Sequence, residues 1–516
     1  MLSQRKRTIV FPPGSLKRWY PHCLLPLLLL VAFPAAAHVG SPDVYYEGDA
    51  GPYHLFITVR VPQVVPGVAA VEVRSQLNDV TQVRILALGL TGAGAKYTPS
   101  PETAERSKQD PQFFTGNIWL MEFGSLQVRV QVDGAHGKGE VSVPVPAISR
   151  QALRMNRPLA GILFALTLVL AFGAVAIATA AAREGELAPG AKPVERDRRR
   201  GRIVLAVAAI LCFTVLYGGR RWWDAEEVIA NANIYQVPQM SATLEAGGQL
   251  LLSVQPAKQQ NRELPRGWSD PSYVADLIPD HNHLMHLFLV RLPQMDRFLH
   301  LHPDKTSSSQ FLLRLPQLPA GRYQMFADVV HQTGFPTTIV GEVELPDIPG
   351  NPPGSDDSEW AGPAILSGAN AGPKCPLPDG GQMVWERPAT PLKANTPTIF
   401  RFRVEDAEGK SVPDLQPYMG MAAHAEFVRS DLTVFAHVHP SGSVPMAALE
   451  LAQQGLLAYG GPEQNAMVSD MAMAPASLSP EVSFPYGFPK PGDYRLFIQV
   501  KRAGQVETGV FDVHVQ

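Results

Sequence analysis

Cysteine is scarce in this sequence of 516 residues. Cys23 lies in an apolar run near the N-terminus, Cys212 in another apolar run, and Cys375 in a segment rich in proline and glycine. The regions that we expect to fold as β-structure therefore lack a disulfide framework and a thiolate metal site. Histidine and methionine are the side chains left to bind soft or borderline metals in an oxidising compartment.

An excess of positive charge is also missing. Lysine and arginine number 44 against 47 acidic residues, and the formal net charge is −3. This balance gives no basic surface for nucleic acid. The sequence contains no Ser-His-Asp pattern, phosphate-binding loop or paired acids that would support catalysis. We therefore expect neither a nucleic-acid partner nor an enzyme.

Charged residues are absent from two long apolar stretches, 158–182 and 203–219. Both are long enough for transmembrane helices, the second only just, and Arg220, Arg221, Trp222 and Trp223 would sit at the interface. The intervening loop 183–202 is rich in arginine, which predicts a cytoplasmic side. No ionisable residue lies at membrane depth, so the two helices are predicted to anchor the protein rather than transport an ion.

Residues 1–37 have the pattern of a secretory signal: basic residues, the apolar run CLLPLLLLVAFP, and three alanines at 35–37. Cleavage there would leave His38 as the first residue, with its α-amine and imidazole both free to bind a metal. His54 is the candidate second ligand. An accidental terminal histidine and an ordinary strand-edge histidine explain the same pattern, so this site stays open.

Alternating apolar residues predict strands in three regions. Residues 38–150 contain six such runs, which favour an immunoglobulin-like β-sandwich. Residues 236–347 and 380–516 are related to each other, because segments 318–345 and 490–515 share a G-x-Y-x-x-F frame. The segment 348–379 between them is rich in proline and glycine and is predicted to be an extended or loosely ordered linker. The expected fold is mainly β: three immunoglobulin-like β-sandwich domains, with a two-helix transmembrane hairpin between the first and second.

The repeat includes a set of histidines. HNHLMHLFLVRLPQMDRFLHLHP at 281–303 returns as MGMAAHAEFVRSDLTVFAHVHP at 419–440. An H-x-H pair in the first copy becomes M-x-M in the second, and imidazole and thioether share chiefly the ability to bind soft or borderline metals. This exchange favours copper, with zinc as the weaker candidate. The aligned pairs are His281 with Met419, His283 with Met421, His286 with His424, His300 with His437, and His302 with His439.

Each copy is predicted to form a β-hairpin that gathers its own histidines. With a turn near Gln294, His286 lies opposite His302 and Phe288 opposite His300. In the second copy the same construction pairs His424 with His439 and Glu426 with His437. Paired side chains have Cβ atoms about 5 Å apart, so three rings could converge on one ion. One H-x-H alone would indicate only a half-buried strand. The two copies predict one metal site each: His286, His300 and His302, supported by His281 and His283, and His424, His437 and His439, supported by Met419 and Met421.

Other candidate residues carry weaker signals. His331 occurs only in the first copy and either joins its site or caps a turn. His514 and His136 are expected to be structural. Met467, Met471 and Met473 follow the second hairpin, and core packing is the plain explanation of their spacing, with delivery of Cu(I) as the alternative.

The HxHP hairpins and the segments GPYHLFITV and NIWLMEFGSLQVRV resemble the YtkA-like and CopC-like immunoglobulin-type domains of bacterial periplasmic proteins. This resemblance implies copper handling at the cell envelope, with His38 in the place of an N-terminal histidine ligand. Residues 38–150 lack the Asp-x-His arrangement that CopC-like domains pair with it.

The expected protein is a bacterial inner-membrane protein with periplasmic N-terminal and C-terminal domains. It would bind copper for storage, transfer, resistance or sensing, with a copper donor or acceptor protein as partner. One alternative is a structural or assembly module whose β-sandwiches bind other proteins. Another is an oxidative copper enzyme that uses the His38 terminus.

Overall fold

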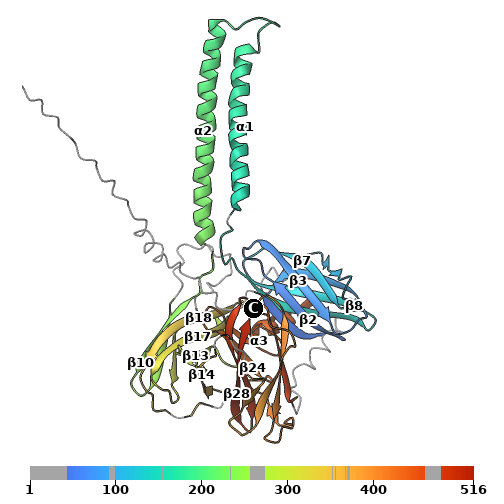
Figure 1. Cartoon of the computed structure of the whole chain (residues 1–516), viewed down its shortest axis with the longest axis vertical. Coiled ribbons are helices and arrows are strands. Elements are labelled where there is room, and N and C mark those ends of the chain that lie inside the picture. The colour runs from blue at the N-terminus through green and yellow to red at the C-terminus, as the bar shows by residue number, and fades with distance from the viewer. Residues whose placement is uncertain are drawn as a thin grey trace, which may run out of the picture. The chain divides into compact units, whose positions relative to one another are not determined.

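The protein is mainly β, with two long apolar helices, as expected (Figure 1). The computed structural model describes residues 43–516 except 92–98, 154, 233, 256–273, 351, 355, 367, 369–371 and 460–477. The predicted signal segment, His38, Met467, Met471 and Met473 lie outside the described residues. From Asp43 onward the described chain belongs to one compact unit, so contacts among its parts define the site.

The first β unit, residues 43–150, has two sheets around one core. One sheet has the order β1-β2-β3-β7-β6 and the other β5-β4-β8-β9. Alternate side chains such as Ile57, Val71, Ile85 and Val130 are buried between them. All six predicted strands are present. Their bounds, with the three additional strands, are β1 Val44–Ala50, β2 Tyr53–Arg60, β3 Gly67–Ser75, β4 Val80–Gly89, β5 Glu102–Thr103, β6 Glu105–Arg106, β7 Phe113–Leu120, β8 Gly124–Gly134 and β9 Gly137–Ala147.

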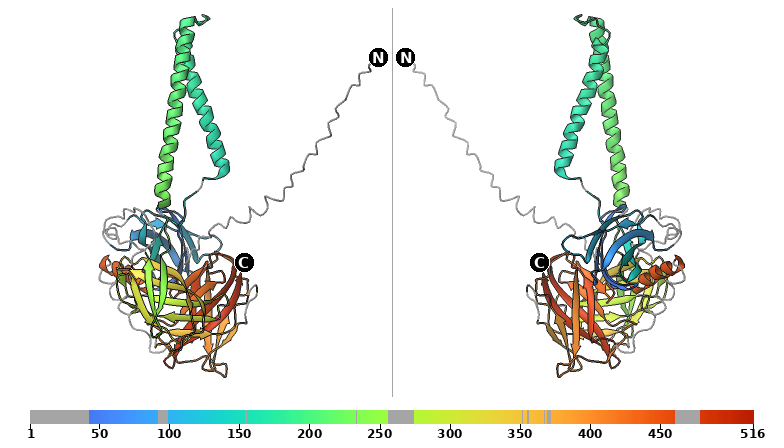
Figure 2. Two further views of the ribbon diagram at one scale, coloured as in Figure 1. Left: turned by 90° about the vertical axis from the view of Figure 1, so that its left-hand side faces the viewer. Right: turned by 90° about the vertical axis from the view of Figure 1, so that its right-hand side faces the viewer.

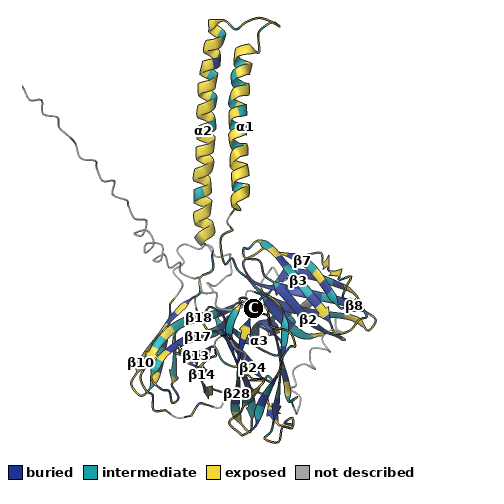
Figure 3. Ribbon diagram, viewed as in Figure 1, coloured by how far each residue is buried: buried dark blue, intermediate teal, exposed yellow. Residues whose placement is uncertain are grey.

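Two helices follow, α1 (Arg157–Glu184) and α2 (Glu195–Ala232), and they lie side by side (Figure 2). Both are long and apolar enough to cross a membrane. Figure 3 shows them almost wholly exposed, unlike the core helix of a soluble protein. The basic segment 183–202 was predicted to be a loop throughout, and this is wrong in its second half. Residues 195–202 form the first turns of α2, because arginine and glutamate favour helix and outweigh the single Gly201.

The second β unit, residues 239–361, is one ten-stranded sheet with the order β15-β16-β11-β10-β18-β17-β13-β14-β19, and β12 pairs with β17. The sheet closes around a core that includes Leu252 of β11 and Leu287 of β13. The strands are β10 Gln239–Glu245, β11 Gln249–Gln255, β12 Leu277–Ile278, β13 His286–Leu292, β14 Arg297–Leu301, β15 Asp304–Lys305, β16 Gln310–Arg314, β17 Gly321–His331, β18 Pro336–Leu345 and β19 Ser358–Ala361.

The third β unit, residues 374–516, has two sheets, β20-β21-β22-β26 and β23-β27-β24-β25, with β28 paired to β27. Helix α3 (Met446–Tyr459) follows the second hairpin and packs its start against the core of the first β unit. The strands are β20 Lys374–Pro376, β21 Gln382–Glu386, β22 Thr398–Glu405, β23 Leu415–Gln416, β24 His424–Arg429, β25 Phe435–Val438, β26 Glu481–Tyr486, β27 Gly492–Arg502 and β28 Gln505–Val515.

The predicted linker 348–379 is extended in part but is not loose there. Strand β19 pairs with β14 of the second unit, and β20 pairs with β21 of the third. Proline and glycine counts could not show this, because the pairing depends on partner edges that are distant in sequence.

Candidate metal centre

The predicted hairpin registers are confirmed. Phe288 pairs with His300 between β13 and β14, and Glu426 pairs with His437 between β24 and β25. Even-numbered residues of β13 and β24 share one face in each hairpin. Strands β13 and β24 are buried almost throughout, because their odd-numbered residues enter the cores of their own units while their even-numbered residues face the other unit.

The two hairpins face each other through reciprocal contacts. Phe298 of the first repeat stacks on Phe497 of the second, with ring centroids 4.0 Å apart. Phe435, which aligns with Phe298, stacks on Phe326, which aligns with Phe497, at 4.3 Å. Contacts of i with j and of the equivalent j with i define a two-fold relation. The second and third β units therefore pair as two halves of a pseudo-dimer.

A tight turn precedes each hairpin and presents one side chain across this interface. His281 and Asn282 have φ values of 51° and 69°, and Met419 and Gly420 have 50° and 80°. Positive φ at both central residues defines a type I′ turn. A left-handed conformation costs a residue with a Cβ about 1 kcal/mol or more, so a histidine and a methionine at these positions suggest a use for their side chains.

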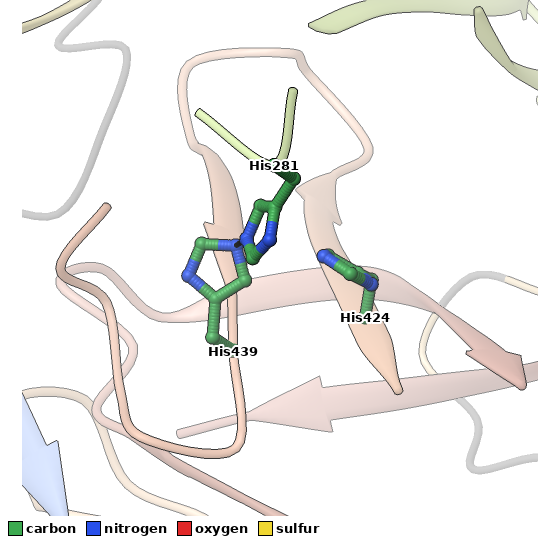
Figure 4. A group of neighbouring side chains, drawn as sticks. All are labelled: His281, His424 and His439. Carbon is green, nitrogen blue, oxygen red and sulfur yellow. Dashed lines mark hydrogen bonds between the residues drawn. The ribbon is translucent and has the colours of Figure 1, made fainter. Parts of the chain in front are cut away.

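His281 joins the histidines of the other repeat. Nitrogens of His281, His424 and His439 lie within 4.8 Å of one another (Figure 4). The two Nε2 atoms of His281 and His439 are 3.3 Å apart. The sequence predicted one site per repeat, with His281 supporting the site of its own repeat. In the structure the His281 ring lies nearer to His424 and His439, with ring centroids 5.0 Å apart in each case, than to His286, at 6.0 Å. The sequence could not show this exchange, because it depends on how the two units dock.

A second triad consists of His286, His300 and His302, whose nitrogens also lie within 4.8 Å of one another. His286 Nδ1 and His300 Nε2 are 3.0 Å apart. His283 stacks on His302 with ring centroids 3.9 Å apart. Unlike His281, His283 therefore lies beside the histidines of its own repeat. This triad has the composition that the sequence predicted.

The two triads belong to one continuous cluster. His437 bridges them, with ring centroids 5.6 Å from His286, 5.7 Å from His300 and 4.6 Å from His439. The cluster consists of eight histidines: His281, His283, His286, His300, His302, His424, His437 and His439. We refer to it below as the histidine cluster.

Five of these rings have one nitrogen beside an oxygen atom, and in His300 it is Nδ1, 3.0 Å from the side-chain oxygen of Gln499. His302 Nδ1 lies 2.9 Å from an Asp357 carboxylate oxygen, and His437 Nδ1 lies 3.4 Å from one of Asp328. His286 Nε2 donates to the Asp280 carbonyl at 3.1 Å, and His439 Nδ1 donates to the Val444 carbonyl at 3.1 Å. In a neutral imidazole the other nitrogen then carries the lone pair. Histidines that bind metals are commonly fixed in this way.

Several polar atoms of the cluster are buried without a hydrogen-bond partner among the described residues. They are Nε2 of His302 and of His437, both nitrogens of His424, and both carboxylate oxygens of Glu426. Leaving a buried polar group unpaired costs about 1–3 kcal/mol. A metal ion would satisfy the nitrogens, so the donor set fits a metal.

Burial sets the charge of the cluster. It lowers the pKa of His286, His300, His424 and His437 well below the usual value, and that of His439 to about 3. These imidazoles are neutral at pH 7, so their lone pairs are available without loss of a proton. Burial also raises the pKa of the Asp328 carboxyl to about 7, and that of Glu426 well above its usual value.

Sequence reasoning missed the acids around the cluster. Asp280, next to His281, accepts the backbone N–H of Ala447 at the start of α3 at 2.8 Å. Asp328 pairs with His286 between β17 and β13, as Gln499 pairs with His424 in the other repeat. Both follow the G-x-Y-x-x-F frame by two residues, a signal that the repeat alignment could have supplied. Asp357 lay in the predicted linker and had no such signal.

Other predicted residues lie apart from the two triads. His54 Nδ1 lies 2.7 Å from Asp49 and its Nε2 3.3 Å from Glu47, on the hairpin β1–β2. His331 lies 2.9 Å from Asp276 and 3.1 Å from the Thr337 hydroxyl. Met419 is buried and Met421 half-buried, in the turn equivalent to that of His281 and His283.

A cavity of about 170 Å³ adjoins the histidine cluster. All three β units contribute to its wall. His283, His286, His437 and His439 are among its lining residues, and most of the remaining lining is apolar.

A protein family described as a domain of unknown function (DUF8832) has a model that matches residues 239–344 and 378–516. These ranges contain all eight histidines of the cluster. The first β unit and both long helices lie outside the match. No curated protein matches the chain.

Solved structures give only distant likenesses. A tetra-tandem repeat of a large adhesion protein shares 8% identity, with 90% of this chain and 74% of that one covered and a TM-score of 0.16. The α2-macroglobulin of E. coli shares 7%, with coverages of 93% and 23% and a TM-score of 0.19. PorU from Porphyromonas gingivalis shares 9%, with coverages of 92% and 34% and a TM-score of 0.14. Scores this low do not define a shared fold.

Proposed function

We propose that this protein is a membrane-anchored metal-binding protein that holds copper in the histidine cluster between its second and third β units. A site that binds copper without converting a substrate suits storage, transfer, resistance or sensing. A copper donor or acceptor protein would be the partner. The two exposed apolar helices would be the anchor, and the β units would lie in the periplasm of a bacterium.

The single observation that carries this proposal is the directed arrangement of the imidazoles. Each of five rings is held on one nitrogen by an oxygen atom, and the other nitrogens meet other rings or lack partners. Histidines that served only to fill a core would not leave buried ring nitrogens unpaired, as Nε2 of His302 and of His437 are among the described residues. The arrangement is that of ligands held ready for an ion.

Copper is favoured by the exchange of His281 for Met419 at equivalent turns. From the two-fold relation we expect Met419 to lie on the side of the first hairpin, as His281 lies on the side of the second. One triad would then be completed by imidazole and the other by a thioether, which is a soft ligand selected by Cu(I) rather than by Zn²⁺. Two sites of different softness fit a protein that handles copper in both oxidation states.

The finer fold and the N-terminal site belong to the same proposal. We propose that the three β units are immunoglobulin-like β-sandwiches related to YtkA-like and CopC-like domains. In the first unit, His54 would form a further copper site with His38. The neighbouring carboxylates of Asp49 and Glu47 support a cation there.

The test is metal titration of the purified full-length protein in detergent with Cu(I), Cu(II) and Zn(II). We expect two copper ions per chain in the histidine cluster, and loss of both in the double variant His302→Ala/His439→Ala. A matched control, His136→Ala/His514→Ala, removes two exposed histidines and should bind as the parent does. Equal binding by the cluster variant would refute the site. Binding of zinc without copper would refute the choice of metal.

A further inference from the structure

The cavity beside the histidine cluster lies where three β units meet. Its walls come from the first, second and third β units, and it measures about 170 Å³. Engineered cavities of about 150 Å³ hold a molecule the size of benzene. The space is therefore large enough for a ligand of several non-hydrogen atoms.

The wall of this cavity is mostly apolar with a smaller polar part. Leu90, Val330 and Phe335 are among the buried side chains that make it apolar. His283, His286, His437 and His439 are among the polar lining residues, together with Asp280 and Asp328. An apolar chamber with a few polar groups is the usual form of a small-molecule site.

The histidines in the cavity wall offer a place where a metal ion could bind. His437 Nε2 is buried without a hydrogen-bond partner among the described residues, and His437 lines the cavity. An ion held by this ring and its neighbours would face the chamber. A ligand in the chamber could therefore reach the ion without displacing either triad.

We propose that the cavity is a binding site for a small exogenous ligand of the cluster's metal: a neutral or monoanionic molecule that donates a nitrogen or oxygen lone pair. This inference rests on the proposed copper site. It adds a substrate or effector site to what would otherwise be a closed store. The first β unit then acts as part of the wall that selects the ligand by size.

The experiment uses full-length copper-loaded protein, with azide as the probe. Azide should bind Cu(II) and produce a new charge-transfer absorption band that saturates with concentration. Val330→Phe and Leu90→Phe fill the chamber from two different units, so each should weaken azide binding at least tenfold. Val68→Phe, a change of similar size at an exposed position of β3, should leave azide binding as in the parent.

Copper stoichiometry is measured on every variant beforehand, which separates this inference from the proposed function. If neither the parent nor any variant binds copper, the metal proposal fails, and the ligand site that rests on it fails too. If copper binds normally but azide produces no band, the ligand site is refuted. Equal azide affinity in the parent and in both filled variants would show that the ligand reaches the metal by another route, which also refutes the cavity as its site.

Discussion

The crossing of His281 into the other repeat can be tested by changing His281 to Asn. Asparagine is one of the few residues that accept the left-handed turn conformation seen at this position, where φ is 51°. The turn should therefore persist while the imidazole is lost. A background with His286→Ala and His302→Ala removes the first triad, so that within the histidine cluster only the ion at His424 and His439 remains to be measured.

The expected loss follows from the ligand count. His281 supplies one of three nitrogens that lie within 4.8 Å of one another. Changes to groups that merely orient a ligand cost about 10–100-fold in metal affinity. Loss of the ligand itself should cost at least about 100-fold, or about 2.7 kcal/mol. Competition with a copper chelator of known affinity measures this in the full-length protein.

His514→Asn in the same background is the control, because His514 is exposed and lies 2.7 Å from Asp493, away from the cluster. An unchanged midpoint of thermal unfolding without metal would show that the turn survives in His281→Asn. If copper affinity were also unchanged, His281 would not be a ligand and the exchange between repeats would lack a function.

Three further predictions concern stability. Burial and the charge of a neighbouring aspartate raise the pKa of Glu507 from 4.5 to about 7. The stability that this side chain contributes is therefore full below about pH 4.5 and is lost as the pH rises through 7. Glu507→Gln should remove on the order of 3 kcal/mol of this pH dependence, measured by denaturant unfolding at pH 5 and pH 8. Arg495 is buried, forms two hydrogen bonds to Asp512 and donates to the Met295 carbonyl of the second unit at 2.6 Å. Arg495→Met should destabilise the protein by about 3–5 kcal/mol because it leaves a buried charge unpaired, and adding Asp512→Asn should restore part of the loss; a double variant less stable than the single one would contradict this. Alanine substitution of Phe298 and Phe497, singly and together, should give a coupling energy of about 0.5–1.5 kcal/mol, and additive losses would mean that the stack across the interface contributes nothing beyond burial.

The sequence predicted those parts of the described fold that depend on residues close together along the chain. Alternating apolar residues predicted six strands of the first unit, and the spacing around Gln294 predicted the pairing of Phe288 with His300. Register was readable because a slip of one residue would put every buried side chain of the hairpin on the other face. The repeat supplied the second hairpin in the same way.

Contacts between residues far apart in the sequence were not readable from local pattern. Asp357 of the predicted linker lies beside His302 within the second unit, and Asp328 of β17 lies beside His437 of the third unit. Neither acid is separated from its histidine by an interval that follows strand or helix periodicity. The position of Asp357 depends on the pairing of β19 with β14, and that of Asp328 depends on which faces of the two units pack together, where the reciprocal phenylalanine stacks lie.

The sequence by itself determined the ligand types, their repetition and the hairpins that hold them, because these depend on side-chain chemistry and on strand periodicity. Only the tertiary structure decided that the two sets form one cluster and that His281 serves the opposite repeat. Two copies of one motif can bind separately or together. The docked faces bring His281 to His439 with 3.3 Å between their Nε2 atoms, and a contact across 158 positions has no local signal in the chain.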